Sequence, residues 1–363
     1  MKLSRRTAFG LAAAMASWPA MAETELVPVT VTVSSNSLAY GGLRMAEQAG
    51  LFQKNGLQPR VIVSESGNAA ITAMLSGSAD LSGAGPSEAL AARVRGQHIL
   101  LFTNLYHGLA GSLVLSKAAA AKLDDAAKGN VEQRVKALDG LRACPGISAP
   151  TSLKQHNTFS VLSVTHRSLI RQRALTIAEP SATSAYMHPI RSAAEAQNAK
   201  IHFVYMAQPA MVAALQAGVI DGMVAGAPFS LAPITSGFGV MWIDGPKADL
   251  PASLLPTSSA CLQTTEAYAR AHPDIIKRLS AVFTDLQVLV RDRPADAKAA
   301  LAKAYGQLDQ ATIDHVFAAE APNWAQPVFT VADIRQEIAI QVSSGALRGV
   351  EQIDPASVLL LPQ

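Results

Sequence analysis

Small polar residues gather at three places where a strand-like pattern of the sequence gives way to a helical one. The first N–H groups of a helix have no partner within the helix and carry a partial positive charge, so such turns bind polar and anionic ligands without basic side chains. Serine and asparagine are also common helix caps, and capping alone would explain any single one of them. Three turns of this kind together favour a site for a polar ligand. The ligand-binding candidates in these turns are Asn36, Ser37 and Tyr40, then Ser66, Gly67 and Asn68, and then Gly85, Pro86, Ser87 and Glu88.

Glu88 has two interpretations, because it lies in the first turn of its predicted helix. A carboxylate there is favoured by the helix dipole and needs no function. Alternatively, it could pair with an amine of a ligand or with an arginine. Asn104 is a further ligand-binding candidate at the end of a predicted strand. The candidates from the second half of the chain are Ser148, Thr151, Ser152, Ala227 and Phe229.

Residue spacing gives little support to covalent catalysis or to metal binding. Residues 85–89 read GPSEA, which approximates the G-x-S-x-G nucleophile turn of hydrolases, but alanine replaces the second glycine and no Asp and His partners can be placed. The eight histidines show no HxH, HxxH or HxxxH spacing. We therefore expect no catalytic residue, no metal and no cofactor, and keep an exported hydrolase that uses Ser87 as an alternative.

The sequence contains one internal repeat. Residues 68–86 read NAAITAMLSGSADLSGAGP, and residues 209–228 read PAMVAALQAGVIDGMVAGAP. Each copy has a helical pattern of small residues, a glycine, an aspartate and a short apolar strand. Gly77 and Gly218 are suited to end a helix, because glycine adopts the left-handed conformation without strain. The repeat predicts one equivalent unit in each of two α/β lobes.

Strand-like and helical patterns alternate around the first copy of the repeat. This order is typical of βαβ units and predicts a mostly parallel, doubly wound sheet, with the ligand at the carboxyl ends of the strands. The predicted strands are 27–34, 58–64, 79–82, 99–105, 113–116, 201–205, 240–243 and 259–262. The predicted helices are 40–52, 67–76, 87–95, 118–141, 273–291, 294–305, 312–319 and 331–343.

The N-terminus is typical of an export signal. Lys2, Arg5 and Arg6 precede an apolar run that is too short to span a membrane, and a small-residue motif predicts cleavage after Ala22. Arg5 and Arg6 also fit twin-arginine export, which stays open beside the general route. We expect a periplasmic protein.

The net charge of +3 belongs entirely to this signal. Residues 1–22 hold three basic residues and no acid, so that 27 basic and 27 acidic residues remain. A neutral exported protein without tracts of Lys or Arg has no electrostatic footprint for nucleic acid.

Residues 222–243 imitate a membrane span, because they carry no charged residue. Pro228, Pro233 and several glycines would interrupt a helix there and leave backbone groups unpaired in lipid. We predict two buried strands joined by a loop instead.

Cys144 and Cys261 are the two cysteines of the chain. An exported protein offers an oxidising environment in which they could pair, but a protein of this size needs no disulfide. The prediction is two buried thiols, with pairing left open.

Three segments resemble the extracytoplasmic substrate-binding proteins of ABC importers, in the group for aliphatic sulfonates, taurine, nitrate and thiamine-precursor pyrimidines. They are residues 49–57 (AGLFQKNGL), 75–80 (LSGSAD) and 216–221 (QAGVID). The resemblance implies an α/β, two-lobed periplasmic-binding-protein fold of type II with a hinged cleft, which closes on its ligand and docks on a permease. Such proteins usually carry a strand and a loop resembling Pro-Gly-Ser after the hinge. Here residues 142–152 stand in that place and supply three of the second-lobe candidates.

We therefore expect the solute-binding component of an ABC importer. Residues 23–120 and 245–363 are predicted to form the first lobe and residues 121–244 the second, with hinge crossings near 116–140 and 244–262. The expected partners are a small polar or anionic organic solute, such as a sulfonate, taurine or nitrate, and an inner-membrane permease with its ATPase. The receptor itself is expected to be a monomer. Few tryptophans are present, which disfavours a sugar site. A receptor for another transporter or for a sensor is the second alternative.

Overall fold

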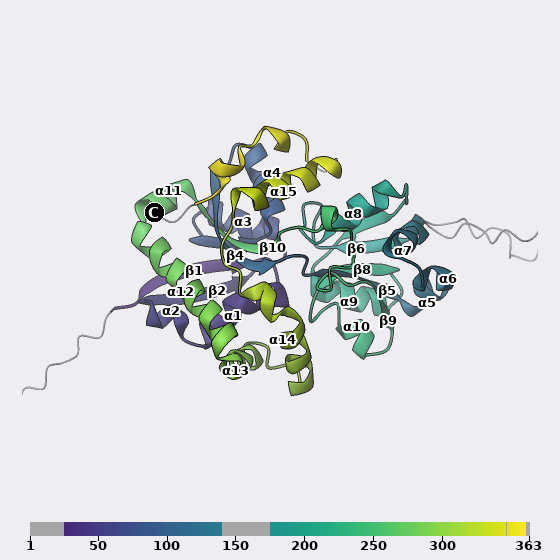
Figure 1. The fold of residues 1–363 in the computed structure, drawn as a ribbon, viewed down its shortest axis with the longest axis horizontal. Helices are drawn as coiled ribbons and strands as arrows, with labels where there is room; N and C mark the ends of the chain where they lie inside the picture. Colours follow the sequence, from purple (N-terminus) through teal and green to yellow (C-terminus); the bar gives the residue numbers. More distant parts are fainter. Residues whose placement is uncertain (1–24, 140–174, 346, 361–363) are drawn as a thin grey trace, which may run out of the picture.

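The computed structural model describes residues 25–139, 175–345 and 347–360. Within these residues the strands form two five-stranded sheets, each flanked by helices (Figure 1). The predicted α/β class and the two-lobed arrangement are confirmed. The predicted signal peptide, residues 1–22, lies outside the described residues.

The first sheet has the strand order β2-β1-β3-β10-β4. Its first three strands are parallel, because helices carry the chain back between them, and β10 runs antiparallel between β3 and β4. The strands are β1 (Val27–Val33), β2 (Leu57–Val63), β3 (Leu81–Ala84), β4 (Ile99–His107) and β10 (Ser258–Thr265), and the connecting helices are α1 (Gly41–Gln48), α2 (Leu51–Lys54), α3 (Gly67–Leu75) and α4 (Pro86–Val94).

The second sheet repeats this plan with the order β7-β6-β8-β5-β9. Strand β6 is parallel to β7 and β8, while β5 runs antiparallel to β8. The strands are β5 (Gly111–Ser116), β6 (Thr176–Glu179), β7 (His202–Tyr205), β8 (Gly222–Gly226) and β9 (Gly239–Ile243). The helices of this lobe are α5 (Lys117–Ala121), α6 (Asp124–Ala127), α7 (Val131–Lys136), α8 (Met187–Ala196), α9 (Gln208–Gln216) and α10 (Ala232–Thr235).

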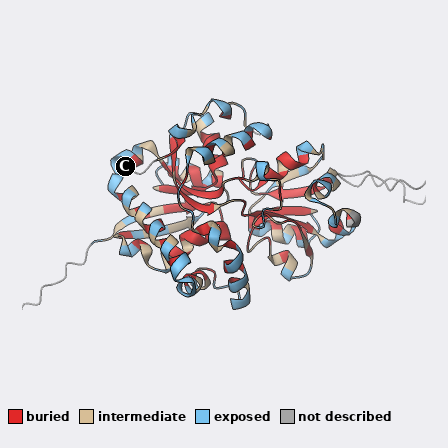
Figure 2. Cartoon of the chain, viewed as in Figure 1, coloured by how far each residue is buried: buried red, intermediate tan, exposed pale blue. Residues whose placement is uncertain are grey.

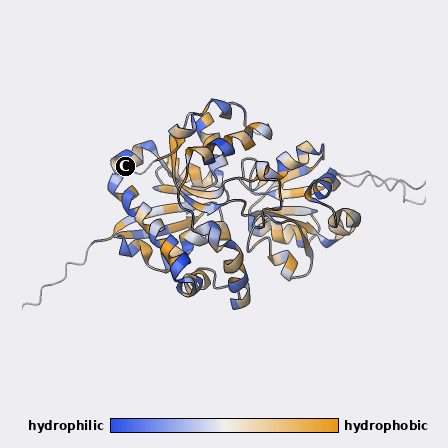
Figure 3. Cartoon of the chain, viewed as in Figure 1, coloured by the Kyte–Doolittle hydropathy of each residue, from blue (hydrophilic) through white to orange (hydrophobic). Residues whose placement is uncertain are grey.

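The C-terminal helices cover the first lobe, as the green and yellow ribbons of Figure 1 show. The long helix α12 buries one apolar face, which includes Leu279, Phe283 and Leu286, as its amphipathic sequence predicts. Both sheets are buried and apolar at their centres (Figures 2 and 3). These helices are α11 (Glu266–Ala271), α12 (Pro273–Asp292), α13 (Pro294–Ala304), α14 (Gln310–Trp324) and α15 (Val331–Ser343).

The internal repeat of the sequence is a structural repeat. Gly77 and Gly218 both take the left-handed conformation, with φ of 76° and 70°. Asp80 accepts a hydrogen bond from the backbone N–H of Thr30 at 2.7 Å, and Asp221 accepts one from Thr176 at 2.8 Å. The equivalent aspartate therefore bonds to the backbone of a neighbouring strand in each lobe, within β1 in the first and at the start of β6 in the second.

The first crossing between the lobes differs from the prediction. The strand predicted at residues 113–116 was assigned to the first lobe, but β5 pairs with β8 and β9 of the second sheet. The chain therefore leaves the first sheet after β4, through residues 108–110, and not near 116–140. It returns between β9 and β10, within the predicted range 244–262.

Two predicted helices are divided in the structure. The helix predicted at 40–52 breaks into α1 and α2 at Gly50, which has a left-handed φ of 72°. The helix predicted at 118–141 consists of α5, α6 and α7 over its described part. Helices this short gain little stability from their own hydrogen bonds. Contacts with the rest of the protein therefore decide where each of them begins and ends.

The uncharged stretch 222–243 forms two strands as predicted, the buried β8 and the partly buried β9, but the connection predicted as a loop contains the short helix α10. Among the described residues we find no helix with the length and apolar character needed to cross a bilayer. Cys261 is a buried free thiol on β10, and Cys144 lies outside the described residues.

Candidate functional site between the lobes

The loops at the carboxyl ends of the parallel strands meet between the two lobes. In the first lobe these loops follow β1, β2 and β3, and in the second they follow β6 and β8. Five hydrogen bonds between described residues join them across the boundary. This boundary is where open α/β sheets bind ligands.

The loop after β1 contacts both loops of the second lobe. Ser37 Oγ lies 3.1 Å from the hydroxyl oxygen of Tyr186, and the backbone N–H of Leu38 donates to the carbonyl of Ala227 at 2.5 Å. Gly226 permits this approach, because a Cβ there would lie 3.1 Å from Cβ of Ser37. Ser37 and Ala227, both predicted site residues, are thus brought together.

The starts of α3 and α4 contact the loop after β6 through Thr183. Asn68 Nδ2 donates to Thr183 Oγ1 at 3.0 Å, and Ser87 Oγ donates to the Thr183 carbonyl at 2.9 Å. Thr183 and Asn68 are half-buried, while Ser87 is buried. Two predicted residues of the first lobe therefore share one partner in the second.

Gly67 and Gly85 surround the carboxyl group of Glu88. A Cβ on Gly67 would lie 2.6 Å from Glu88 Oε1, and a Cβ on Gly85 would lie 2.5 Å from Oε2. The same Gly85 position is 2.5 Å from Cβ of Ala185, so the carboxyl group lies at the boundary with the second lobe. Burial raises the pKa of Glu88 to about 8, although hydrogen bonds from the backbone of Glu88 and Gly85 and from Ser87 favour the ionised form.

Buried aromatic side chains hold the loop after β1 in place. Tyr305 donates to the Ser37 carbonyl at 2.9 Å, and Trp324 Nε1 donates to the Leu38 carbonyl at 2.8 Å. Tyr40, a predicted site residue, donates to the carbonyl of Gly83 at 3.0 Å and ties this loop to β3. Burial raises the pKa of Tyr40 well above its usual value, so it acts as a neutral hydrogen-bonding group.

Other predicted site residues have local roles. Ser66 caps α3 by accepting from the N–H of Ala69 at 3.2 Å, and Pro86 occupies the first turn of α4. Asn104 remains within the first lobe, where its side chain accepts from the N–H of Tyr106. Asn36 is half-buried in the loop after β1.

The structure describes only some of the site residues predicted for the second lobe. Phe229 packs against the apolar core of the second lobe, beside residues of β8 and α9. Ser148, Thr151 and Ser152 lie outside the described residues. Besides Ala227, the described contacts of this lobe come from the loop after β6, residues 180–186, which sequence reasoning missed.

A signal for this loop was present in the sequence. Residues 34–40 read SSNSLAY and residues 180–186 read PSATSAY, so a hydroxyl residue and an Ala-Tyr pair recur at the same positions. Tyr40 and Tyr186 end the two copies, one after β1 and the other after β6. The repeat therefore extends to the first loop of each lobe.

A buried ion pair lies at the end of β6, directly before the second-lobe copy of the loop, residues 180–186. Glu179, at the end of β6, is fully buried and accepts from Arg191 of α8 at 2.8 Å, while the guanidinium lies 4.6 Å from the centre of the Phe203 ring. Burial raises the pKa of Glu179 to about 7, against the opposing effect of Arg191. Burial, with Arg191 nearby, lowers the pKa of His188 to about 4.

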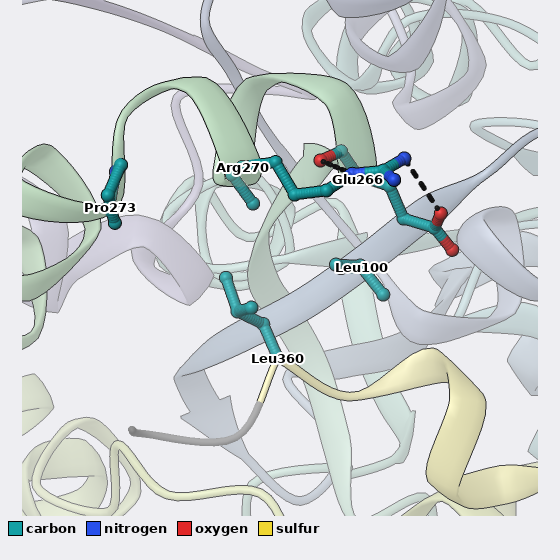
Figure 4. Close-up of a pocket in the computed structure, with 6 residues that line it drawn as sticks. Leu100, Glu266, Arg270, Pro273 and Leu360 are labelled. Atoms are coloured by element: carbon teal, nitrogen blue, oxygen red, sulfur yellow. Dashed lines mark hydrogen bonds and ion pairs between the residues drawn. The ribbon is translucent and has the colours of Figure 1, made fainter.

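A hollow of about 450 Å³ lies elsewhere on the first lobe, between β4, α11 and Leu360 (Figure 4). Glu266 and Arg270 pair along its wall at 3.4 Å. None of the predicted site residues lines it, and its open, mostly apolar wall offers few convergent polar groups. The described residues contain no cluster of His, Cys, Asp or Glu suited to a metal ion.

Comparison with known proteins identifies a family. A model of the NMT1-like family matches residues 24–306. No curated protein matches the sequence significantly.

Solved structures share the fold at low sequence identity. The alkanesulfonate-binding protein SsuA from Xanthomonas axonopodis pv. citri, bound to MOPS, is 16% identical with a TM-score of 0.65, covering 92% of this chain and 98% of that chain. The periplasmic nitrate-binding protein NrtA from Synechocystis PCC 6803 is 11% identical with a TM-score of 0.61, covering 93% and 90%. The enzyme DszB, in complex with biphenyl-2-sulfinic acid, is 11% identical with a TM-score of 0.50, covering 89% and 95%.

Proposed function

We propose that this chain, which belongs to the NMT1-like family, is the solute-binding component of an ABC importer. The observation that carries the proposal is the meeting of polar loops from both lobes at the carboxyl ends of their parallel strands. Proteins of the same fold are named for binding alkanesulfonates and nitrate. A small polar solute between the lobes fits this arrangement.

Binding would act through the position of the lobes. Two connections join the sheets, since residues 111–243 supply every strand of the second sheet and none of the first. A solute that contacts both lobes binds the closed arrangement better than the open one and so shifts the population toward it. The closed form would then be recognised by an inner-membrane permease, which passes the solute on with its ATPase.

In this proposal, Ser37 and Asn68 of the first lobe and Thr183 and Tyr186 of the second contact the solute. Each has a hydroxyl or amide group at the boundary, and each is now bonded to a group of the opposite lobe. A solute would exchange these bonds for bonds to itself. The protein works in the periplasm as a monomer, after removal of residues 1–22.

Thermal denaturation of the mature chain with a panel of sulfonates, nitrate, carboxylates, amines and pyrimidines tests the proposal. A ligand at a hundredfold excess over its Kd stabilises the folded protein by about 2.7 kcal/mol. Thr183→Ala should lower the affinity of a solute found in this way by about tenfold, through one lost hydrogen bond.

The matched control is Thr284→Ala, because Thr284 is exposed on α12 and bonds within its own helix. It should leave the affinity unchanged. Two results would contradict a solute site between the lobes. One is that no solute raises the denaturation temperature, and the other is that both variants lose the same amount of solute affinity.

The DszB fold neighbour makes an enzyme the second candidate. Ser87 is the available nucleophile in the predicted turn, but its hydroxyl donates to the Thr183 carbonyl, and none of the described histidines hydrogen bonds to it. A nucleophilic serine needs an adjacent base. Turnover of a bound solute that disappears in Ser87→Ala would establish the enzyme in place of the receptor.

A further inference from the structure

The loops that the structure describes between the lobes carry no basic residue. Residues 34–40, 64–68, 83–88, 180–186 and 226–230 contain no Lys, Arg or His, and their two acids are Glu65 and Glu88. Glu65 is exposed, whereas Glu88 is 5% exposed. The single buried charge-bearing group of these loops is therefore a carboxyl group.

The helix ends that could bind an anion are partly used by the protein itself. The carboxyl group of Glu88 accepts hydrogen bonds from the backbone of Gly85 and of Glu88, at the start of α4. At the start of α3, Ser66 Oγ accepts from the N–H of Ala69. An anionic solute would compete with these internal acceptors and would also face the charge of Glu88.

No basic side chain offsets the Glu88 carboxyl group among its described electrostatic neighbours. These neighbours are Glu337 of α15, Cys261 of β10, and the phenols of Tyr40 and Tyr186. None of the four carries a positive charge. A buried carboxylate without a cation is costly, and a ligand cation would remove much of that cost.

The second lobe adds further acceptors at the same boundary. The carbonyl of Thr183 and the carbonyl of Ala227 both point to the first lobe, where they accept from Ser87 Oγ and from the N–H of Leu38. Ser87 Oγ also lies 3.2 Å from Glu88 Oε2, so the Thr183 carbonyl and the carboxyl group share a neighbour. An ammonium group, which has three donors and no acceptor, suits such a set.

We propose that the site between the lobes takes a solute with a protonated amine, for which Glu88 is the counter-ion, and not a purely anionic solute. The inference rests on the proposed solute-binding function and specifies its chemical class. Gly67 and Gly85 leave the space in which the carboxyl group lies. Closure of the second lobe would then enclose the ion pair.

Matched probes test the charge preference. Calorimetry of the mature chain compares taurine with isethionate, which differ by an ammonium in place of a hydroxyl, and butylamine with butanesulfonate. A charge-assisted hydrogen bond contributes about 1.5–3 kcal/mol, so the member of each pair that bears an amine should bind about 10- to 100-fold more tightly. Glu88→Gln should abolish the difference.

The control variant is Glu266→Gln, since Glu266 also lies in the first turn of a helix, α11, but outside the boundary between the lobes. It should retain the full amine preference. Glu88→Gln keeps the shape of the protonated side chain, and circular dichroism checks that the variant is folded.

The wild-type protein gives a second readout that needs no variant. Glu88 must ionise to pair with the ammonium, and burial holds its pKa at about 8, so amine binding should release a proton. The affinity for the amine should therefore rise with pH from 6.5 to 8.5, by up to about tenfold per unit.

Each outcome decides one of the two proposals. Tighter binding of isethionate and butanesulfonate than of their amine partners, unaffected by Glu88→Gln, overturns the amine inference and leaves the receptor intact. Amine binding with equal affinity in Glu88→Gln also overturns the inference. Absence of binding by every probe of either charge overturns the solute-receptor proposal itself.

Discussion

Gly85 is the position where the smallest change should act on the contact between the lobes. Its backbone has φ of −76° and ψ of 157°, a conformation that alanine adopts without strain. A Cβ there would lie 2.5 Å from Cβ of Ala185 and 2.5 Å from Glu88 Oε2. Gly85→Ala is therefore a purely steric perturbation of the boundary.

The size of the effect follows from these distances. Two carbon atoms pack at about 3.5–4.0 Å, and Cβ of Ala185 cannot move without its backbone, so the loop after β6 has to retreat by about 1 Å. The bond from Ser87 Oγ to the Thr183 carbonyl, now 2.9 Å, would then exceed hydrogen-bonding range. Crowding at about 1–3 kcal/mol and one lost bond at about 1 kcal/mol give about 2–4 kcal/mol against closure.

Small-angle scattering of the chain without ligand measures this loss of closure. A penalty of about 2 kcal/mol already lowers the ratio of closed to open molecules about thirtyfold, so the radius of gyration of Gly85→Ala should increase. Urea denaturation should show that each lobe remains folded.

Two glycine variants serve as controls for the steric argument. The three atoms nearest to a Cβ on Gly67 all belong to the side chain of Glu88, in the same lobe, and a Cβ on Gly306 has its nearest neighbour at 4.0 Å. Neither should separate the lobes. A Gly85→Ala protein with the scattering profile and solute affinity of the wild type would refute the reasoning.

Three further predictions concern stability and are checked by urea denaturation. Arg191→Ala should lower the free energy of unfolding by about 1–3 kcal/mol at pH 7. This loss is smaller than the usual cost of breaking a buried ion pair, because Glu179 can take up a proton instead. An unchanged midpoint of urea denaturation would contradict this prediction. Burial raises the pKa of Glu320 to about 8, so the protonated side chain contributes its full stability below pH 4.5, and this contribution is lost as the pH rises through 8. Glu320→Gln should reduce the difference in unfolding free energy between pH 5.5 and pH 8.5, by up to about 1.4 kcal/mol per pH unit. Greater stability of the wild-type protein at pH 8.5 than at pH 5.5 would argue against this. Asp80→Ala and Asp221→Ala should each cost about 1–2 kcal/mol, since each aspartate accepts from one backbone N–H of a neighbouring strand, and clearly unequal costs would disprove equivalent roles.

Local patterns were sufficient to predict most of the first lobe. The alternation in residues 27–33 and the helical period in 331–343 appear in the structure as β1 and α15, because each pattern depends on residues a few positions apart. Strand β5 shows the limit. Its apolar sequence indicates a buried strand, but its partners β8 and β9 lie about a hundred residues later, and no local signal says which sheet it joins.

The candidate site was predicted more fully on one side than on the other. Ser37, Asn68 and Ser87 follow strands that the sequence shows plainly, and all three contact the second lobe. Thr183 was missed because its loop has no periodic pattern, and its identity depends on comparison with residues 34–40. Gly85 was expected to admit a ligand, but in the structure its open space receives Ala185.

The position of β10 constrains the order in which the chain can fold. This strand lies between β3 and β4, yet residues 258–265 come after every strand of the second lobe. A chain extended only as far as residue 243 therefore holds every described strand of the second sheet and a first sheet that lacks an inner strand. Long-range pairing of this kind is slow, so the second lobe should fold first and the first lobe should close around β10 afterwards.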